Sequence, residues 1–282
     1  MPDLSNPRAE RVRGIRALSG RPARSRAGRY IVEGPQSVRE AVVHAREAVR
    51  EVYVTEAAAE RYPEIVAACD GLWLRTGTPD VLDAMSPDAQ GVLAVLEQRP
   101  TSLDELVASG PRLVAALVDA RDPGNAGTVV RAVDAAGGDG VVLAGSSVDP
   151  HNPKVVRSTA GSLFHVPVVA GDDARDIAAV VARLRAAGLQ VLAADGAGEH
   201  DLDELLDVAG AAPAGTPDLS APTAWVFGNE ARGLTGEQRA LADHVVRAPL
   251  RGRAESLNLA MAATVCLYAS ARAQRDRAVP RS

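Results

Sequence analysis

The fold is decided by the stretch Val226-Phe227-Gly228-Asn229-Glu230-Ala231-Arg232-Gly233-Leu234. An apolar run, expected to be a strand, leads directly into Gly228, where the chain can turn sharply and bring backbone amide and carbonyl groups close to a ligand. A turn that only ends a strand needs this glycine, but it needs neither Asn229-Glu230 nor Gly233. The stretch therefore predicts a turn that contacts a ligand at the end of a buried strand.

A second polar turn follows at Pro249-Leu250-Arg251-Gly252-Arg253-Ala254-Glu255-Ser256-Leu257-Asn258, and we expect a helix to begin near Ser256. Capping of that helix explains Ser256 adequately on its own. Asn258 lies on the first turn of that helix and is not explained by a cap at Ser256, so it needs a separate explanation. Gly228 lies at a fixed distance upstream. The combination favours capping together with ligand contact over capping alone.

A third polar turn lies upstream at Asp122-Pro123-Gly124-Asn125-Ala126-Gly127-Thr128-Val129-Val130-Arg131. It closes an expected strand and opens a helix, for which Asn125 is a plausible N-cap. Ligand sites in open α/β sheets gather beyond the carboxyl ends of the strands, so Arg131 can reach a phosphate or a ribose at that edge. The pattern leaves open the alternative that Arg131 is an ordinary surface arginine.

Two groups of cations are candidates for contacts with a polyanion. Residues 1–29 contain eight arginines against two acidic residues, a local excess of six positive charges in a chain whose net charge is −5. Farther along, Lys154 and Arg157 lie three residues apart, close enough to share one face of a helix and grip a phosphate. A solvated terminus and a solvated helix are the alternatives that remain open.

The chain is expected to form two α/β domains. We place a basic arm at residues 1–29, a small domain at 30–98, a linker at 99–111, a larger domain at 112–275 and a tail at 276–282. In the small domain we expect a helix at 35–48 and strands at 30–33, 51–54, 73–75 and 91–96. The strands expected in the larger domain are 113–118, 140–144, 189–193, 224–227 and 244–246. Its helices are expected to begin near Asn125, Asp173, Thr235 and Ser256. This alternation predicts a mainly parallel sheet covered by helices.

Composition excludes several other classes of protein. With 46% apolar residues among 282, the chain is not expected to be disordered. Its apolar runs are shorter than the roughly 18 residues needed to span a bilayer, so a cytoplasmic protein is expected. Cys69 and Cys266 are too few for a disulfide framework, and the five histidines have no metal-ligand spacing, so no metal site is expected. The phosphate-binding loops of dinucleotide-binding and Walker-type proteins are also missing.

The three polar turns, in this order and with their polar residues intact, resemble the three motifs of the SpoU/TrmH branch of the SPOUT methyltransferases. The resemblance covers most of residues 112–273. It implies an α/β fold in which a trefoil-knotted SPOUT catalytic domain, usually a homodimer, follows a small ribosomal-protein-like α/β RNA-binding domain. It also implies methyl transfer from S-adenosylmethionine to a ribose 2′-hydroxyl of structured RNA, with ribosomal RNA favoured over transfer RNA.

The resemblance implies roles for individual residues. The cofactor pocket is expected to be lined largely by backbone groups of Gly228, Ala248, Leu250 and Leu257. The residues expected around the ribose and its adjacent phosphate are Asn125, Arg131, Ser256 and Asn258. Glu230 is expected to be an anchor across a subunit contact. The two groups of cations described above supply the expected RNA contacts, which are Lys154, Arg157, Arg24 and Arg26.

The role of Arg131 stays open between two possibilities. Relatives are often described with this arginine as the general base, but a neutral guanidinium at pH 7 costs roughly 7 to 9 kcal/mol. Arg131 can instead hold the phosphate and stabilise the developing alkoxide. Methyl transfer from a sulfonium depends on alignment and demands no metal. A noncatalytic RNA-binding or assembly factor with this fold is an alternative, disfavoured by the four polar residues around the expected ribose position.

Overall fold

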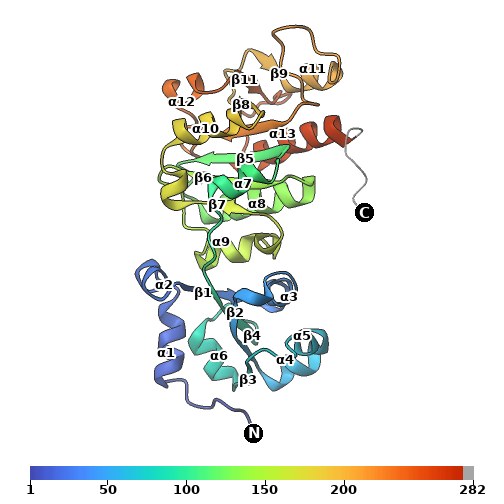
Figure 1. The fold of residues 1–282 in the computed structure, drawn as a ribbon. Helices are drawn as coiled ribbons and strands as arrows, with labels where there is room; N and C mark the ends of the chain where they lie inside the picture. Colours follow the sequence, from blue (N-terminus) through green and yellow to red (C-terminus); the bar gives the residue numbers. More distant parts are fainter. Residues whose placement is uncertain (276–282) are drawn as a thin grey trace. The chain divides into compact units, whose positions relative to one another are not determined.

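The computed structural model describes residues 1–275 and divides into two compact units (Figure 1). The N-terminal unit comprises Met1–Arg99 together with Asp149–His165, and the C-terminal unit comprises the remaining residues from Pro100 onward. The expected tail, residues 276–282, lies outside the described residues. Each unit is an α/β structure with its own sheet and its own buried core.

A four-stranded sheet in the order β1-β4-β2-β3 forms the centre of the N-terminal unit. β4 lies antiparallel between β1 and β2, and β2 is parallel to β3. The strands are β1 (Arg29–Glu33), β2 (Val49–Val54), β3 (Leu74–Thr76) and β4 (Val92–Glu97). The helices are α1 (Glu10–Ala17), α2 (Arg21–Ala27), α3 (Pro35–His44), α4 (Glu56–Arg61), α5 (Pro63–Ala68), α6 (Pro79–Met85) and α9 (Pro153–Ser158), with a 3-10 turn η1 (Arg46–Ala48).

The basic N-terminal segment is folded into the N-terminal unit. Val12 and Ile15 of α1, and Leu18 after it, are buried in the same apolar cluster as Ile31 and Tyr53 of the sheet. Because these apolar residues recur every third position, α1 buries one face and leaves the arginines between them exposed. The expected arm is therefore part of a packed domain.

Arg24 differs from the other arginines of this segment because its side chain is only 2% exposed. Its Nε and Nη2 donate to the Asp149 carboxylate at 3.1 and 2.7 Å, and Nη1 donates to the carbonyl oxygens of Leu18 and Ser19. Burial alone would raise the pKa of Asp149, but hydrogen bonds from His151 and Arg24 outweigh it and hold that pKa well below its ordinary value. Arg24 therefore has a structural role.

We predict that Asp149→Asn destabilises the protein by roughly 3 kcal/mol, because it leaves the Arg24 guanidinium buried without a counter-charge. The lowered pKa of Asp149 also sets the pH dependence. Its stabilising contribution is complete above the ordinary carboxyl value of 3.8 and is lost as the pH falls from there towards the folded-state pKa. Urea denaturation should show a large difference between wild type and variant at pH 7 and a smaller one at pH 3. Equal unfolding midpoints at pH 7 would contradict this role.

Seven strands in the order β7-β6-β5-β10-β8-β11-β9 form the sheet of the C-terminal unit, and all neighbouring pairs are parallel. The strands are β5 (Leu113–Val118), β6 (Gly140–Ala144), β7 (Val168–Val169), β8 (Gln190–Ala194), β9 (His200–Asp201), β10 (Thr223–Phe227) and β11 (His244–Arg247). The helices are α7 (Leu103–Ala108), α8 (Pro123–Ala136), α10 (Ile177–Ala186), α11 (Leu202–Asp207), α12 (Gly236–Ala240) and α13 (Leu259–Gln274). Short 3-10 turns are η2 (Ser162–Phe164), which belongs to the N-terminal unit, and η3 (Gly171–Ala174).

Helices cover both faces of this sheet (Figure 1). Ala115 and Leu117 of β5 pack with α8 and α13 on one face, while Val114 and Ala116 pack with α7 and α10 on the opposite face. α13 is also joined to β10 by a buried hydrogen bond, in which the indole nitrogen of Trp225 donates to the Ser270 hydroxyl at 2.9 Å. The sheet and its helices thus form three layers that hold the start of α13 at a defined place.

The predicted parallel sheet is confirmed, and the ends of the expected strands differ from the observed ones by at most two residues. β7 and β9 were not predicted, because two-residue strands carry no periodic pattern. Two predicted helix starts were wrong, since α10 begins at Ile177 and α13 at Leu259. Among the described residues, no helix combines the length and apolar character needed to cross a bilayer.

Two segments depart from the expected domain boundaries. The expected linker, residues 99–111, contains α7, and its Leu103 and Leu106 are buried in the core of the C-terminal unit. Residues 149–165 were expected in the larger domain, but they pack with the N-terminal unit. Val156 of α9 lies in the same apolar cluster as Val32 and Val52, and Asp149 binds Arg24 across 125 positions of sequence. Local patterns carry no information about such distant partners.

Candidate active site

Three polar turns meet at the carboxyl edge of the C-terminal sheet, as its strand directions require. β5, β10 and β11 are followed by residues 119–125, 228–234 and 248–258. β5 and β10 are neighbours, and β8 alone separates β10 from β11. The sheet therefore gathers the three segments that the sequence singled out.

The start of α8 is capped by Asp122, and the expected N-cap Asn125 was wrong. The Asp122 carboxylate accepts a hydrogen bond from the backbone N–H of Asn125 at 2.7 Å, and Pro123 occupies the first helical turn. Asn125 lies inside that turn, which leaves its side-chain amide for other contacts. Aspartate and asparagine cap helices equally well, so composition could not distinguish the two positions.

Asn258 caps α13 and also joins α13 to α8. Its Oδ1 accepts from the backbone N–H groups of Ala260 and Met261 at 2.9 and 3.4 Å, while its Nδ2 donates to Oδ1 of Asn125 at 3.0 Å. The first and third motifs are thus in direct contact. Ser256, expected near the helix start, is exposed and lies three residues before α13.

The turn after β10 is tied to the turn after β5 by two side chains. Asn229, to which the sequence assigned no role, donates through Nδ2 to the carbonyl oxygen of Asp119 at 2.7 Å. Glu230 accepts from the backbone N–H groups of Arg121 and Asp122 at 3.3 and 3.1 Å. Within this chain Glu230 therefore holds the backbone that leads into α8. Its expected role across a subunit contact stays a prediction.

Gly228 is required by the close approach of two backbone segments. Asn229 and Gly233 exchange backbone hydrogen bonds of 3.1 and 2.8 Å, which fold residues 228–234 back on themselves. A Cβ atom at Gly228 would lie 2.2 Å from the carbonyl carbon of Gly233 and 2.4 Å from the nitrogen of Leu234. The turn needs this glycine for its own packing, whatever it binds.

The segment between β11 and α13 leaves backbone polar groups available. Among the described residues, no backbone-to-backbone hydrogen bond outside regular helices and strands involves residues 249–257. Ala248 is partly buried, and Leu250 and Leu257 are 40% and 37% exposed. Because backbone N–H and C=O groups require partners, this segment offers donors and acceptors to a ligand.

Arg131 lies on α8, six residues after Asn125, and its side chain is exposed. Within residues 1–275, no hydrogen bond or ion pair engages its guanidinium, so Arg131 is not joined to Asn125 or Asn258. An exposed guanidinium of this kind can form charge-assisted hydrogen bonds to a phosphate. The structure thus brings together Asn125 and Asn258, and leaves Arg131 available for an anionic ligand.

The four expected RNA contacts all lie in the N-terminal unit, and they differ in availability. Lys154 and Arg26 are exposed. Arg157 is 39% exposed and pairs with Glu33 at 3.0 Å and with Asp88. Arg24 is buried, and its guanidinium donates to Asp149 and to two backbone carbonyl oxygens, so the expected RNA contact at Arg24 is wrong.

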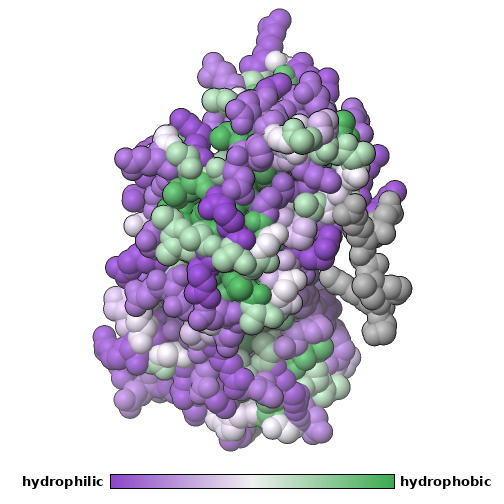
Figure 2. Space-filling model, turned by 45° about the horizontal axis from the view of Figure 1, so that its top comes forward, coloured by the Kyte–Doolittle hydropathy of each residue, from purple (hydrophilic) through white to green (hydrophobic). Residues whose placement is uncertain are grey.

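Most of the surface drawn in Figure 2 is hydrophilic, and apolar residues gather in limited patches. The largest run of exposed apolar side chains in the C-terminal unit belongs to the end of the third motif and to α13. These residues are Leu250, Leu257, Met261, Val265 and Tyr268. Met261, Val265 and Tyr268 lie on one face of α13, and that face is exposed.

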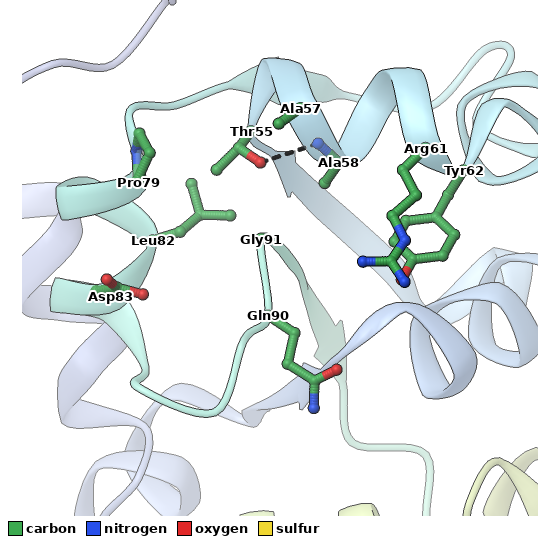
Figure 3. Close-up of a pocket in the computed structure, with 10 residues that line it drawn as sticks. All are labelled: Thr55, Ala57, Ala58, Arg61, Tyr62, Pro79, Leu82, Asp83, Gln90 and Gly91. Atoms are coloured by element: carbon green, nitrogen blue, oxygen red, sulfur yellow. Dashed lines mark hydrogen bonds between the residues drawn. The ribbon is translucent and has the colours of Figure 1, made fainter.

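A hollow of about 310 Å³ lies in the N-terminal unit (Figure 3). Its wall is formed by the starts of α4 and α6, the end of α4 and the turn before β4, and it carries both Arg61 and Asp83. The Thr55 hydroxyl at its rim accepts a hydrogen bond from the Ala58 backbone N–H and so caps α4. None of the expected site residues lines this hollow, and we assign it no ligand.

Together the fold and the edge site define an α/β protein whose candidate ligand site lies at the carboxyl ends of parallel strands. The model of the SpoU rRNA Methylase family matches residues 112–268, more than half of the chain, so the chain belongs to this family. The family predicted from the three motifs is thereby confirmed.

Relatives extend the match over most of the chain. This chain is 31% identical over 258 residues to the 23S rRNA (uridine(2479)-2′-O)-methyltransferase of Streptomyces viridochromogenes, and the match covers 90% of this chain and 86% of that protein. It is 29% identical over 273 residues to the 23S rRNA (guanosine(2553)-2′-O)-methyltransferase RlmP of Bacillus subtilis, covering 95% and 98%. The SpoU methyltransferase AviRb from Streptomyces viridochromogenes, solved with AdoMet, superimposes with a TM-score of 0.78 at 31% identity, covering 96% of this chain and 100% of that one.

Proposed function

We propose that this chain transfers a methyl group from S-adenosylmethionine to a ribose 2′-hydroxyl of structured RNA, and that its substrate is ribosomal RNA. Family membership and two relatives matched over most of their length support this proposal. The comparisons confirm the predicted enzyme class and the predicted cofactor. The structural observation that carries the proposal is the contact between Asn258 and Asn125, because it assembles the first and third motifs at one edge.

The edge of the C-terminal sheet fits S-adenosylmethionine, which supplies an electrophilic methyl group when bound. Residues 249–257 offer backbone donors and acceptors for its polar groups. The folded turn at Gly228 follows β10, and residues 249–257 follow β11. Because only β8 separates these two strands, the turn supplies further backbone atoms at the same edge of the sheet. The residues proposed to line the pocket remain Gly228, Ala248, Leu250 and Leu257.

The residues proposed around the ribose have distinct tasks. Asn125 and Asn258 fix each other and present amide groups to the sugar. Arg131 binds the adjacent phosphate and stabilises negative charge on the 2′-oxygen as the hydroxyl proton passes to solvent water. Ser256 contributes an exposed hydroxyl. Because the attacking oxygen must lie in line with the methyl group, this positioning is the main contribution of the protein to the rate.

We also propose that the backbone around β10, β11 and α13 forms the trefoil knot that the family implies. One tight crossing of segments distant in sequence supports this topology. A Cβ atom at Gly198 would lie 2.6 Å from the backbone nitrogen of Arg247. Such close passage of main chains is expected where one segment threads past another.

The N-terminal unit is proposed to bind the RNA substrate. Arg26 and Lys154 are exposed and Arg157 is half-exposed, so these three side chains can contact phosphates. The ribosomal-protein-like character of this unit and a cytoplasmic location stay predictions.

The direct test is incubation of the protein with labelled S-adenosylmethionine and separated ribosomal and transfer RNAs that lack the modification. Label in ribosomal RNA, at a position resistant to alkaline cleavage, would support 2′-O-methylation of that substrate. Label only in transfer RNA would replace the substrate class. Cofactor binding without any label would favour a noncatalytic RNA-binding or assembly factor.

We further propose a homodimer formed through α13. Met261, Val265 and Tyr268 are 63%, 45% and 49% exposed and lie on one face of this helix. The opposite face of α13 is buried in the C-terminal core through Ala263 and Leu267. A helix that is apolar on both faces needs a second partner, and an identical α13 in a second copy supplies a matching surface.

Val265→Asp is expected to convert the dimer into a monomer, because a dimer interface would have to bury an unpaired carboxylate. Analytical ultracentrifugation of both proteins at micromolar concentration measures the change. The matched control is Val43→Asp, which alters a valine that is 55% exposed on α3 of the N-terminal unit. A wild-type monomer, or a dimer that survives Val265→Asp, would exclude α13 as the interface.

A further inference from the structure

Four of the five histidines form two pairs that the sequence spacing did not predict. The rings of His44 and His165 lie 4.6 Å apart, and those of His200 and His244 lie 5.0 Å apart. A glutamate lies beside each pair. In the N-terminal unit, the ligand atoms of Glu40, His44 and His165 are all within 4.8 Å of one another.

The distances in this first group suit a tetrahedral cation. Oε2 of Glu40 lies 3.2 Å from Nε2 of His165 and 3.5 Å from Nε2 of His44. A tetrahedral Zn²⁺ with ligand bonds of about 2.0 to 2.2 Å separates neighbouring ligand atoms by roughly 3.4 Å. The carboxylate oxygen therefore lies from each imidazole nitrogen at about the separation found between zinc ligands, and all three ligand atoms are within 4.8 Å of one another.

The contacts around the carboxylate hold it in this orientation. Nε and Nη2 of Arg39 each lie 3.3 Å from Oε1 of Glu40, which leaves Oε2 towards the histidines. Gly161 makes room for the side chain, since a Cβ atom there would lie 2.4 Å from Cγ of Glu40. Gln36 donates to the carbonyl oxygen of Ala160 at 3.1 Å and so holds this segment against α3. Outer contacts of this kind orient metal ligands.

We propose that Glu40, His44 and His165 bind a zinc-class divalent cation that fastens residues 149–165 to α3. Glu40 and His44 present ligands from one helical face, and His165 closes the site from the end of the other segment. Two imidazoles with one carboxylate favour Zn²⁺ over Mg²⁺ or Ca²⁺, which prefer oxygen ligands. The side chains of His44 and His165 are 48% and 30% exposed, so water reaches the fourth position.

The second group, Glu199 with His200 and His244, is a weaker candidate and a useful control. Nε2 of His200 lies 3.2 Å from Nδ1 of His244 in a hydrogen bond, as Nε2 of His165 does from Oε2 of Glu40 in the first group. Glu199 is 69% exposed, so its carboxylate is less restrained than that of Glu40, which is 21% exposed. A cation should therefore prefer the first group.

The experiment uses the full chain after treatment with a chelator. Zn²⁺ is titrated in competition with a chromophoric chelator, and Co²⁺ is titrated while its visible absorption reports the coordination geometry. We expect one equivalent of Zn²⁺ and a tetrahedral Co²⁺ spectrum. Glu40→Gln, which keeps the side-chain shape, and His165→Ala should each raise the Zn²⁺ Kd at least tenfold, whereas His200→Ala should leave it unchanged.

Three results would overturn the proposal: no Zn²⁺ binding by the wild-type chain, an octahedral Co²⁺ spectrum, or an unchanged Kd in Glu40→Gln. If His200→Ala lost Zn²⁺ binding while Glu40→Gln and His165→Ala kept it, the cation would belong to the second group instead. Circular dichroism of each metal-free variant checks that its fold is retained, and His44→Ala provides a further ligand substitution if His165→Ala does not fold. Methyl transfer is not a readout here, so the result is independent of the proposed enzymatic function.

Discussion

Replacement of Arg131 by alanine is expected to lower the rate of RNA methylation by about a thousandfold, the range seen when a group that stabilises transition-state charge is removed. Arg131 is exposed and engages no other group among the described residues, so the substitution removes a ligand contact and breaks none that supports the fold. Binding of S-adenosylmethionine should be nearly unchanged. Single-turnover methylation and calorimetric cofactor titration measure the two quantities separately.

The control for this prediction is Arg272→Ala, which removes another arginine of the same unit, near the end of α13. This end of the helix lies towards the amino ends of the strands, where Gln274 donates to the carbonyl oxygen of Ala221. Near-normal turnover by Arg131→Ala would remove the central assignment of the site. Arg131→Lys separates the effect of charge from that of geometry. Lysine keeps the positive charge but loses the bidentate geometry with which the guanidinium binds a phosphate.

Gly228→Ala is expected to destabilise the protein by about 3 kcal/mol and to weaken S-adenosylmethionine binding at least tenfold. The added methyl group would overlap the backbone of Gly233 and Leu234 at 2.2 to 2.5 Å. Backbone atoms cannot rotate away as a flexible side chain can. Relief of the overlap would have to open the hydrogen bonds between Asn229 and Gly233, and these shape the turn.

Gly236→Ala is the matched control, because a Cβ atom at Gly236 meets nothing within 4 Å and its backbone conformation is an ordinary one. Thermal unfolding and cofactor titration of the two variants separate a packing effect from a general effect of losing glycine. If Gly228→Ala and Gly236→Ala gave the same unfolding temperature and the same cofactor affinity, the tight turn at residues 228–234 would not be needed for the site.

Much of the candidate site was predictable because its three turns carry more polar residues than strand connections require. Gly228, Asn125 and Asn258 were singled out from such turns, and the structure brings the two asparagines into contact. The errors lie in which residue caps which helix. Asp122 and Asn258 are the caps, whereas Asn125 and Ser256 were expected. Several residue types cap helices equally well, so the choice depends on where the backbone turns.

The sequence by itself determined the family, the parallel α/β sheet and the positions of the three motifs, because strand alternation and turn composition are local properties of the chain. Only the tertiary structure decided which distant residues meet. In the structure Arg24 is buried against Asp149, and residues 149–165 pack with the N-terminal unit. Glu40, His44 and His165 lie close together. These contacts depend on packing and charge pairing between segments more than a hundred residues apart, which no local pattern of side chains records.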